Sequence, residues 1–217
     1  MKKKKCFLFD CDDILLDYMK GIKTFIEEHY NIKPQGLPDD YVLDEWAGIS
    51  GNKMMKIISH FNEQSYEFGL LEALDERTVQ VMKSLHTVLQ GEADLIVLTK
   101  SGTLGHGEVL RKVNLINVFG NIFKDIIIIE KYESKTGSIL KLQQDYDILC
   151  FVDDYVKNID DAVACGVNSV LIERSHNIKH KVNPNYTFFK DWYDLNKYLI
   201  SLINEHNLHG VHNKNME

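Results

Sequence analysis

The sequence predicts an α/β protein whose core is a doubly wound parallel sheet, with an all-helical domain inserted into it. Five short apolar runs lack the polar alternation of half-exposed strands, which is typical of strands that helices cover on both faces. These runs are residues 6–9, 94–98, 126–129, 148–152 and 169–172. Helical patterns separate the last four runs, and strands that alternate with helices form parallel βαβ units. The first two runs are far apart, with several helical patterns between them.

The second, third and fourth apolar runs are each followed by a segment with helical periodicity. These segments are residues 105–113, 138–144 and 156–165. The last of them ends before Gly166, a residue type that suits the end of a helix. The apolar faces expected for the first two are Val109, Leu110 and Val113, and Ile139, Leu140 and Leu142.

The segment between the first two strands, residues 16–90, is longer than the single helix that a simple crossover needs. Its helical patterns lie at 19–29, 39–46, 52–61 and 75–89. We therefore expect residues 1–15 and 91–205 to form the α/β core and residues 16–90 to form a helical domain. Residues 206–217 are polar, and we expect a frayed tail there.

Composition and charge limit the classes of partner. The 217 residues carry 25 basic and 32 acidic side chains, a formal net charge of −7, whereas nucleic acids and anionic membranes require a basic face. No stretch approaches the roughly 18 apolar residues of a membrane span. The four cysteines form no CxxC pair, which favours free thiols in a reducing cytoplasm. A small anionic ligand held by local cations is compatible with this balance.

Polar residues gather where the predicted strands end. They are Asp10, Asp12 and Asp13 after the first strand, Thr99 after the second, Lys135 after the third, and Asp153 and Asp154 after the fourth. Ligands of open α/β sheets bind beyond the carboxyl ends of the strands. Acids, a hydroxyl and a lysine are therefore expected to converge at one edge.

Three of these carboxylates predict a metal site. Successive strand side chains alternate between faces, so Asp10 and Asp12 are expected to point the same way, and Asp154 joins them from another strand. Two unit charges about 5 Å apart, at an effective dielectric of about 20, repel by about 3 kcal/mol, and a cation relieves this repulsion. Ligand sets made only of oxygen favour Mg²⁺ over zinc or copper. We therefore predict a Mg²⁺ site at Asp10, Asp12 and Asp154.

Four segments, in order, resemble the motifs of the haloacid dehalogenase superfamily. "FLFDCDDILLD" (7–17) is similar to the first motif, a hydrophobic strand followed by DxD. "LIVLTKSG" (95–102) is similar to the second, a strand that ends in Thr or Ser. "ESKTGSILKL" (133–142) resembles the third, with its lysine, and "CFVDDYVKNIDDAVACG" (150–166) the fourth. The resemblance covers roughly residues 6–175 and implies a Rossmann-like core.

The resemblance implies a role for each motif residue. Asp10 would be the nucleophile that attacks phosphorus and forms an aspartyl-phosphate. Asp12 would be the general acid and base, with its backbone carbonyl on Mg²⁺. The Thr99 hydroxyl and the Lys135 ammonium would hold the phosphoryl oxygens, and Asp154 would complete the metal site. The outer supports of that site would be Asp153 and Asn158.

Three positions depart from the pattern of the superfamily, and one of them, Ile14 in place of the usual Thr or Val, is an easy substitute. Asp13 stands where Gly usually follows DxD, and Asp tolerates a positive φ better than most residues. We therefore expect a less flexible turn rather than an inactive site. The third-motif lysine lacks its usual following proline, which leaves Lys131 as a rival to Lys135, although Ile139 and Leu140 follow Lys135 at the expected distance.

Residues 16–90 resemble the helical cap of many members of this superfamily, which closes over the site and reads the leaving group. Within it, "WAGISGNKMMKII" (46–58) is similar to the cap loop and helix that face the site in phosphoglycolate-phosphatase-like members. This resemblance implies Ser50, Asn52 and Lys53 as substrate contacts.

The motifs together predict a cytoplasmic Mg²⁺-dependent phosphatase that hydrolyses a small phosphorylated metabolite. Two alternatives stay open. A phosphomutase of the same superfamily is poorly separated from a hydrolase by sequence. A non-catalytic module that binds a phosphate or metabolite would suit Asp13 and the residues around Thr99. A dehalogenase would not need Asp12, and a phosphonatase would use Lys53 to form a Schiff base.

Overall fold

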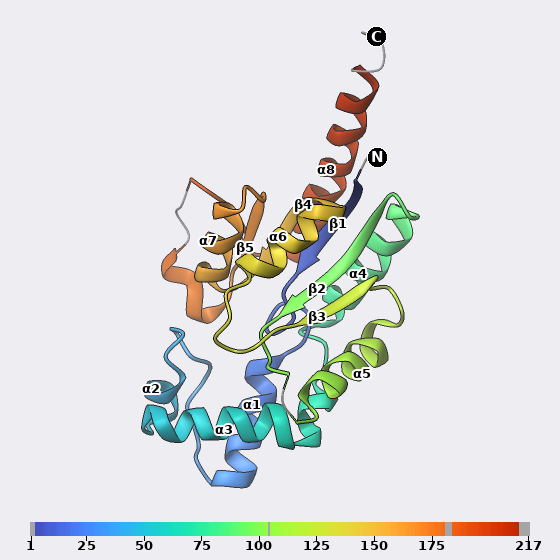
Figure 1. Ribbon diagram of the computed structural model, residues 1–217. Coiled ribbons are helices and arrows are strands. Elements are labelled where there is room, and N and C mark those ends of the chain that lie inside the picture. Colours follow the sequence, from blue (N-terminus) through green and yellow to red (C-terminus); the bar gives the residue numbers. More distant parts are fainter. Residues whose placement is uncertain (1–2, 104, 181–183, 213–217) are drawn as a thin grey trace.

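A six-stranded sheet, all of whose strands run parallel, forms the centre of the molecule (Figure 1). The computed structural model describes residues 3–103, 105–180 and 184–212. The strand order is β3-β2-β1-β4-β5-β6. The strands are β1 (Lys4–Phe9), β2 (Ala93–Thr99), β3 (Asp125–Ile128), β4 (Tyr146–Asp153), β5 (Ser169–Ile172) and β6 (Thr187–Phe189). The first five confirm the predicted strands; β6 was not predicted, because three residues give no readable pattern.

Helices cover both faces of the sheet, which confirms the predicted doubly wound α/β class. One face is covered by α6 (Thr136–Asp145) and α7 (Val156–Ala164), and the other by α4 (Glu76–Leu89), α5 (Gly107–Phe119) and α8 (Trp192–His212). Because strand side chains alternate, Cys6 and Leu8 of β1 pack towards α6 and α7, while Phe7 and Phe9 pack on the opposite side. All four of these side chains are fully buried.

The buried face of α5 differs from the predicted one. Val109 and Val113 are 64% and 46% exposed, whereas Arg111 and Asn114 are buried. Leu110 does pack against the hydrophobic core, as predicted, but Val109 and Val113 point outward. The inner side carries the polar Arg111 and Asn114 beside apolar residues, and Arg111 faces the carboxyl end of β1.

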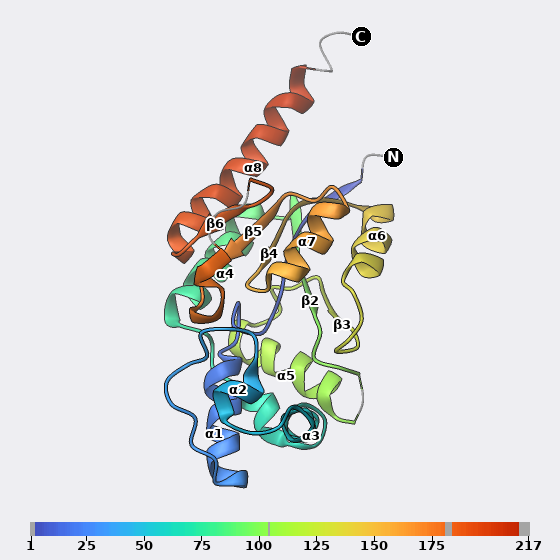
Figure 2. The ribbon, with the colours of Figure 1, turned by 90° about the vertical axis from the view of Figure 1, so that its left-hand side faces the viewer.

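A helical insertion, residues 18–70, lies beyond the carboxyl ends of the strands (Figures 1 and 2). It comprises α1 (Tyr18–Tyr30), α2 (Leu43–Ala47), α3 (Gly51–Gln64) and the 3₁₀ turn η1 (Tyr66–Leu70). α2 begins later than the predicted segment at 39–46. The buried side chains of Ile22, Phe25 and Phe61 join the same hydrophobic cluster as Phe7 and Phe9 of β1. The next helix, α4, packs on β2 and α8 rather than with α1–α3.

The last helix, α8, continues through His212, where the sequence suggested a frayed tail from residue 206. Residues 213–217 lie outside the described residues. Among the described residues, no helix has both the length and the apolar character needed to cross a membrane.

Candidate active site

The ammonium group of Lys135 stands between two carboxylates at the end of the sheet. Its Nζ donates to Asp10 Oδ1 at 2.5 Å and to Asp153 Oδ2 at 2.7 Å. Asp10 follows β1 directly, Asp153 is the last residue of β4, and Lys135 precedes α6. Lys135 is fully buried; burial lowers the pKa of its ammonium, but Asp10 and Asp153 outweigh this and raise it. Lys135 is therefore a permanent buried cation beside Asp10.

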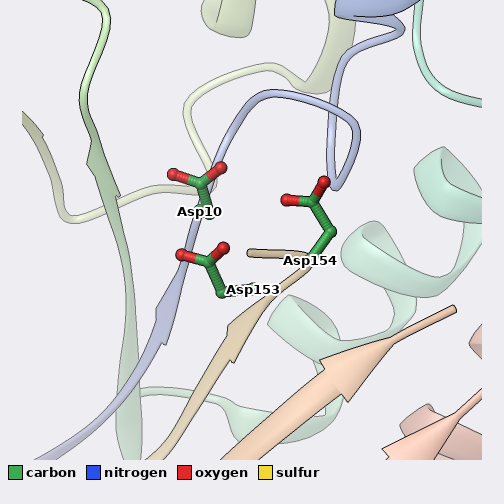
Figure 3. Close-up of side chains that lie close together, drawn as sticks. All are labelled: Asp10, Asp153 and Asp154. Carbon is green, nitrogen blue, oxygen red and sulfur yellow. The ribbon is translucent and has the colours of Figure 1, made fainter. Parts of the chain in front are cut away.

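Three carboxylates meet at this point, those of Asp10, Asp153 and Asp154 (Figure 3). One oxygen atom from each lies within 4.8 Å of the others. Asp153 is engaged by N–H donors, because its Oδ1 accepts from the Tyr155 backbone at 2.7 Å and its Oδ2 from Asn158 Nδ2 at 3.0 Å. Asp153 and Asn158, which the resemblance implies as outer supports of the metal site, are thus hydrogen-bonded to each other, and Asp153 is itself a member of the cluster.

One oxygen of Asp10 and one of Asp154 are each held by a side chain. Asp10 Oδ1 accepts from Lys135, and Asp154 Oδ2 lies 2.6 Å from Nε2 of His176. The Cys11 backbone N–H also donates to the Asp10 carboxyl. Carboxylate oxygens have further lone pairs, and hard divalent cations such as Mg²⁺ take oxygen ligands of this type. The residues present therefore fit a Mg²⁺ site.

Burial makes this cluster electrostatically costly. It raises the pKa of the Asp10 carboxyl; the Lys135 ammonium opposes the rise, and Asp154 adds to it. Burial likewise raises the pKa of Asp153 to about 8, against the opposing effect of Lys135. A cation bound here would favour the ionised carboxylates, because an opposite charge stabilises them in a site of low dielectric.

The carboxylate of Asp12 is not the third member of this cluster, in contrast to the prediction. It forms an ion pair with Arg111, whose Nη2 lies 2.5 Å from Asp12 Oδ1. β1 ends at Phe9, so the alternation of strand side chains does not extend to Asp12. Burial raises the pKa of Asp12 to about 6, and the Arg111 guanidinium limits the rise. A carboxyl with such a pKa can both give and take a proton near neutral pH.

At the end of β2 and just after it, two hydroxyl groups are buried and have no hydrogen-bond partner among the described residues. They are Oγ1 of Thr99 and Oγ of Ser101. Thr99 does not cap a helix, because α5 begins only at Gly107. Buried polar atoms are nearly always paired, so unpaired hydroxyls beside a carboxylate cluster indicate a place for a polar ligand. The sequence predicted Thr99 as a ligand contact but did not single out Ser101.

Asp13 occupies the position where the superfamily pattern has Gly. Its φ is 54°, in the left-handed region, and its side chain accepts a hydrogen bond from the Met19 backbone N–H at 3.0 Å. This confirms the expectation that Asp can adopt the turn. The side chain also satisfies a free N–H in the first turn of α1, which Gly could not do.

The two rival lysines have different partners. Lys131 Nζ lies 2.6 Å from Glu63 Oε1 and 2.7 Å from Ser59 Oγ, and both partners belong to α3. Lys131 thus joins the helical insertion to the core, whereas Lys135 reaches Asp10. The geometry favours Lys135 as the lysine of the site.

Ser50 and Asn52 lie at the start of α3, where both side chains are exposed. Lys53 is exposed as well. No hydrogen bond among the described residues joins any of the three to the carboxylates. Other residues of the insertion approach the site: Tyr41 donates its O–H to the backbone carbonyl of Asp154 at 2.7 Å, and Asn62 donates to that of Ser101 at 3.2 Å.

Sequence reasoning missed Arg111, His176 and Tyr41. Each lies outside the four motif segments, and each reaches the site only through the folded chain. Arg111 left a signal, a basic residue within the predicted helix at 105–113, but nothing in the sequence gave it a carboxylate partner. His176 belongs to a 3₁₀ segment, η2 (Ser175–His180), that has no sequence pattern.

Comparison with known proteins gives matches in structure alone. No protein-family model and no curated protein matches the chain. A haloacid dehalogenase-like hydrolase family protein from Streptococcus pneumoniae is 13% identical, with a TM-score of 0.61 over 92% of this chain and 100% of that one. D,D-heptose 1,7-bisphosphate phosphatase from B. bronchiseptica, solved with magnesium and phosphate, is 10% identical, with a TM-score of 0.55 over 91% and 98%. An L-2-haloacid dehalogenase is 13% identical, with a TM-score of 0.52 over 91% and 99%.

The chain therefore has the haloacid dehalogenase-like fold, as its four motif segments imply. The identities are too low to carry an activity from one protein to another, and the similar structures include both a phosphatase and a dehalogenase. The chemistry has to be argued from the site.

Proposed function

We propose that the protein is a Mg²⁺-dependent phosphatase that hydrolyses a small phosphomonoester through an aspartyl-phosphate. One observation carries this proposal. Asp10 has one carboxylate oxygen held by Lys135 at 2.5 Å, and it lies within the three-carboxylate cluster with Asp154. A carboxylate placed between a fixed cation and a candidate metal site suits a nucleophile that attacks an anionic phosphoryl group.

In the first step, a carboxylate oxygen of Asp10 attacks phosphorus, and the bond between phosphorus and the leaving oxygen breaks. Asp12 gives its proton to that oxygen, so an alcohol departs. In the second step, Asp12 takes a proton from water, and the water oxygen attacks phosphorus. The bond between phosphorus and the Asp10 oxygen breaks, which regenerates the Asp10 carboxylate and releases inorganic phosphate. The Lys135 ammonium and the Thr99 hydroxyl would hold the phosphoryl oxygens through both steps.

Mg²⁺ would be held by the carboxylates of Asp10 and Asp154 and by the backbone carbonyl of Asp12. When bound, it would supply positive charge that offsets the negative charge of the phosphoryl group. The buried hydroxyl of Thr99, which has no hydrogen-bond partner among the described residues, and the buried ammonium of Lys135 support the same assignment, because both can donate to an anionic phosphoryl group.

The helical insertion would act as the cap and select the leaving group. It lies beyond the carboxyl ends of the strands (Figure 2), and Lys131, Tyr41 and Asn62 provide contacts between it and the core. A covered site suits a small phosphorylated metabolite. We keep Ser50 and Asn52 as candidate contacts for the leaving group, as the phosphoglycolate-phosphatase-like segment implies. Four free cysteines support action in a reducing cytoplasm.

The test is turnover of p-nitrophenyl phosphate with and without Mg²⁺. We expect turnover that requires the metal and falls by at least about 10³-fold in Asp10→Asn, which keeps the shape but removes the nucleophile. A 5-fold excess of EDTA over the metal should abolish activity, and added Mg²⁺ should restore it. Absence of turnover on a broad panel of phosphomonoesters with Mg²⁺ present would refute the proposal and favour a binding module.

A further inference from the structure

Arg111 is the largest fully buried side chain of the protein among the described residues, and it faces the candidate acid. It projects from the inner side of α5, with none of its surface exposed. Its Nη2 lies 2.5 Å from Oδ1 of Asp12, whose side chain is 25% exposed. The Arg111 end of the ion pair is thus enclosed in the protein interior, whereas the Asp12 end is partly exposed to solvent.

The guanidinium of Arg111 is fixed by little other than this carboxylate. Its Nε and Nη1 have no hydrogen-bond partner among the described residues. Its central carbon lies 4.1 Å from the centre of the Phe68 ring, which belongs to η1 of the helical insertion. The ring stacks on the guanidinium but offers no acceptor for its N–H groups. Oδ1 of Asp12 is therefore the acceptor that holds the guanidinium, and it can do so while the other carboxyl oxygen carries a proton.

Two linked hydrogen bonds join the helical insertion to the core near the ion pair of Arg111 and Asp12. Tyr18 of α1 donates its O–H to Asn62 of α3 at 3.1 Å, and Asn62 donates to the Ser101 backbone carbonyl. These contacts join the helical insertion to the loop after β2, so the surroundings of the ion pair are built from both parts of the protein. A side chain held on one oxygen by a rigid donor keeps its other oxygen in a defined place.

We propose that Arg111 is a positioning residue that holds the carboxyl group of Asp12 in place for proton transfer to the leaving group. This inference rests on the proposed function. Arg111 does not touch the reacting atoms; it acts through Asp12. Its loss is therefore expected to slow the transfer of a proton rather than the binding of the phosphoryl group.

The test compares two phosphate esters of similar shape. They differ in how strongly their hydrolysis depends on protonation of the leaving oxygen. Phenolate is a poorer leaving group than p-nitrophenolate, so phenyl phosphate depends more on an acid than p-nitrophenyl phosphate does. The quantity kcat/KM reports the steps up to formation of the aspartyl-phosphate, so it isolates the acid role of Asp12 from its later role as a base. We expect Arg111→Met to lower kcat/KM about 100-fold for phenyl phosphate and less than about 10-fold for p-nitrophenyl phosphate. KM should change little for either ester.

Two further variants make the test specific. Asp12→Asn should show the same dependence on the leaving group, and Arg111→Lys, which keeps the charge, should recover part of the loss. Asn114→Leu is the matched control, because Asn114 is buried one turn further along α5 and donates to the Leu71 carbonyl at 2.8 Å instead of to Asp12. It should affect both esters equally.

A double variant keeps the test decisive if Arg111→Met does not fold. Asp12→Asn with Arg111→Met leaves no buried charge without its partner, which favours folding. Its kcat/KM should match that of Asp12→Asn alone for both esters. An equal loss on both esters in Arg111→Met, or a further loss in the double variant, would overturn the inference and leave the phosphatase proposal standing. A wild-type protein that turns over neither ester would refute both.

Discussion

His176 and Asp154 form a buried pair in which the imidazole Nε2 lies 2.6 Å from the carboxylate Oδ2. The hydrogen bond leaves Oδ1 of Asp154 as the oxygen available to a cation. Groups that hold a metal ligand in orientation are commonly worth 10- to 100-fold in metal affinity. Substitution of His176 is therefore a direct test of the proposed Mg²⁺ site.

We predict that His176→Ala raises the Mg²⁺ concentration needed for half-maximal activity by about 10-fold or more, because the Asp154 carboxylate loses its fixed orientation. Titration of activity with Mg²⁺ at fixed ester concentration measures this. His180→Ala is the matched control, since His180 is exposed and ends the same 3₁₀ segment. Equal Mg²⁺ requirements in the His176→Ala variant and the wild type would mean that Asp154 does not bind the metal.

The two lysines of the β3–α6 loop predict different outcomes. Lys135→Met leaves the carboxylates of Asp10 and Asp153 buried without their cation, a change that typically costs about 3–5 kcal/mol, and it should abolish turnover. Lys131→Met removes an ion pair with Glu63 and a hydrogen bond to Ser59, both on α3 of the insertion and away from the carboxylates. It should lower kcat/KM by less than about 10-fold. Thermal melting and kinetics of the two variants give both quantities, and a greater loss of turnover in Lys131→Met would reverse the assignment.

The buried carboxyl groups predict that metal-free protein becomes less stable as the pH rises. The pKa of Asp12 is about 6 and that of Asp153 about 8 in the folded protein, both above the ordinary value of 3.8. At a pH between the ordinary pKa of 3.8 and these folded-state pKa values, the folded state binds more protons than the unfolded state. The free energy of unfolding therefore falls as the pH increases. The stabilisation is complete below about pH 4 and is lost as the pH passes through 6 to 8.

In EDTA, the melting temperature at pH 5.5 should exceed that at pH 8 by roughly 5 °C, a shift that corresponds to about 2 kcal/mol for a domain of this size. Mg²⁺ at pH 8 should recover part of the difference by binding the ionised carboxylates. Asp153→Asn should flatten the dependence above pH 6. A melting temperature that increases from pH 5.5 to pH 8 in EDTA would contradict the assigned directions of the pKa shifts.

Two glycines with positive φ test the contact between α3 and the loop before α5. A Cβ at Gly105, whose φ is 61°, would lie 2.2 Å from the Glu63 backbone carbonyl oxygen, whereas a Cβ at Gly48, whose φ is 63°, would meet nothing within 4 Å. Gly48→Ala should cost about 1 kcal/mol from its left-handed backbone conformation alone. Gly105→Ala should cost about 3 kcal/mol, because the insertion must also shift. Urea denaturation measures the difference, and equal costs would place the insertion further from this loop.

The strands and the motif residues at their ends could be predicted because each is a local pattern. An unbroken apolar run such as "ILCFV" indicates a strand buried on both faces, and parallel strands bring their carboxyl ends to one edge. Asp10, Lys135 and Asp154 therefore came together as expected. The positive φ of Asp13 could also be anticipated, because the resemblance has Gly at this position and Asp tolerates such a φ better than most residues.

What the sequence could not supply were contacts between distant segments. The carboxylate of Asp12 was expected beside Asp10, but it turns to Arg111 of α5, because the chain leaves the strand geometry after Phe9. The inner face of α5 was assigned by hydrophobicity, a criterion that fails where a helix borders a polar site. His176 comes from a short turn whose position depends on the packing of β5.

The hydrogen bond from Tyr41 to the backbone carbonyl of Asp154 has a consequence for how the proposed phosphatase would release its product. Tyr41 belongs to the helical insertion, so any swing of that part away from the sheet breaks a bond at the loop that carries Asp154. If the proposal holds, we expect inorganic phosphate to leave when the insertion swings away. Its departure and the loosening of the loop that carries Asp154 would then occur as one event.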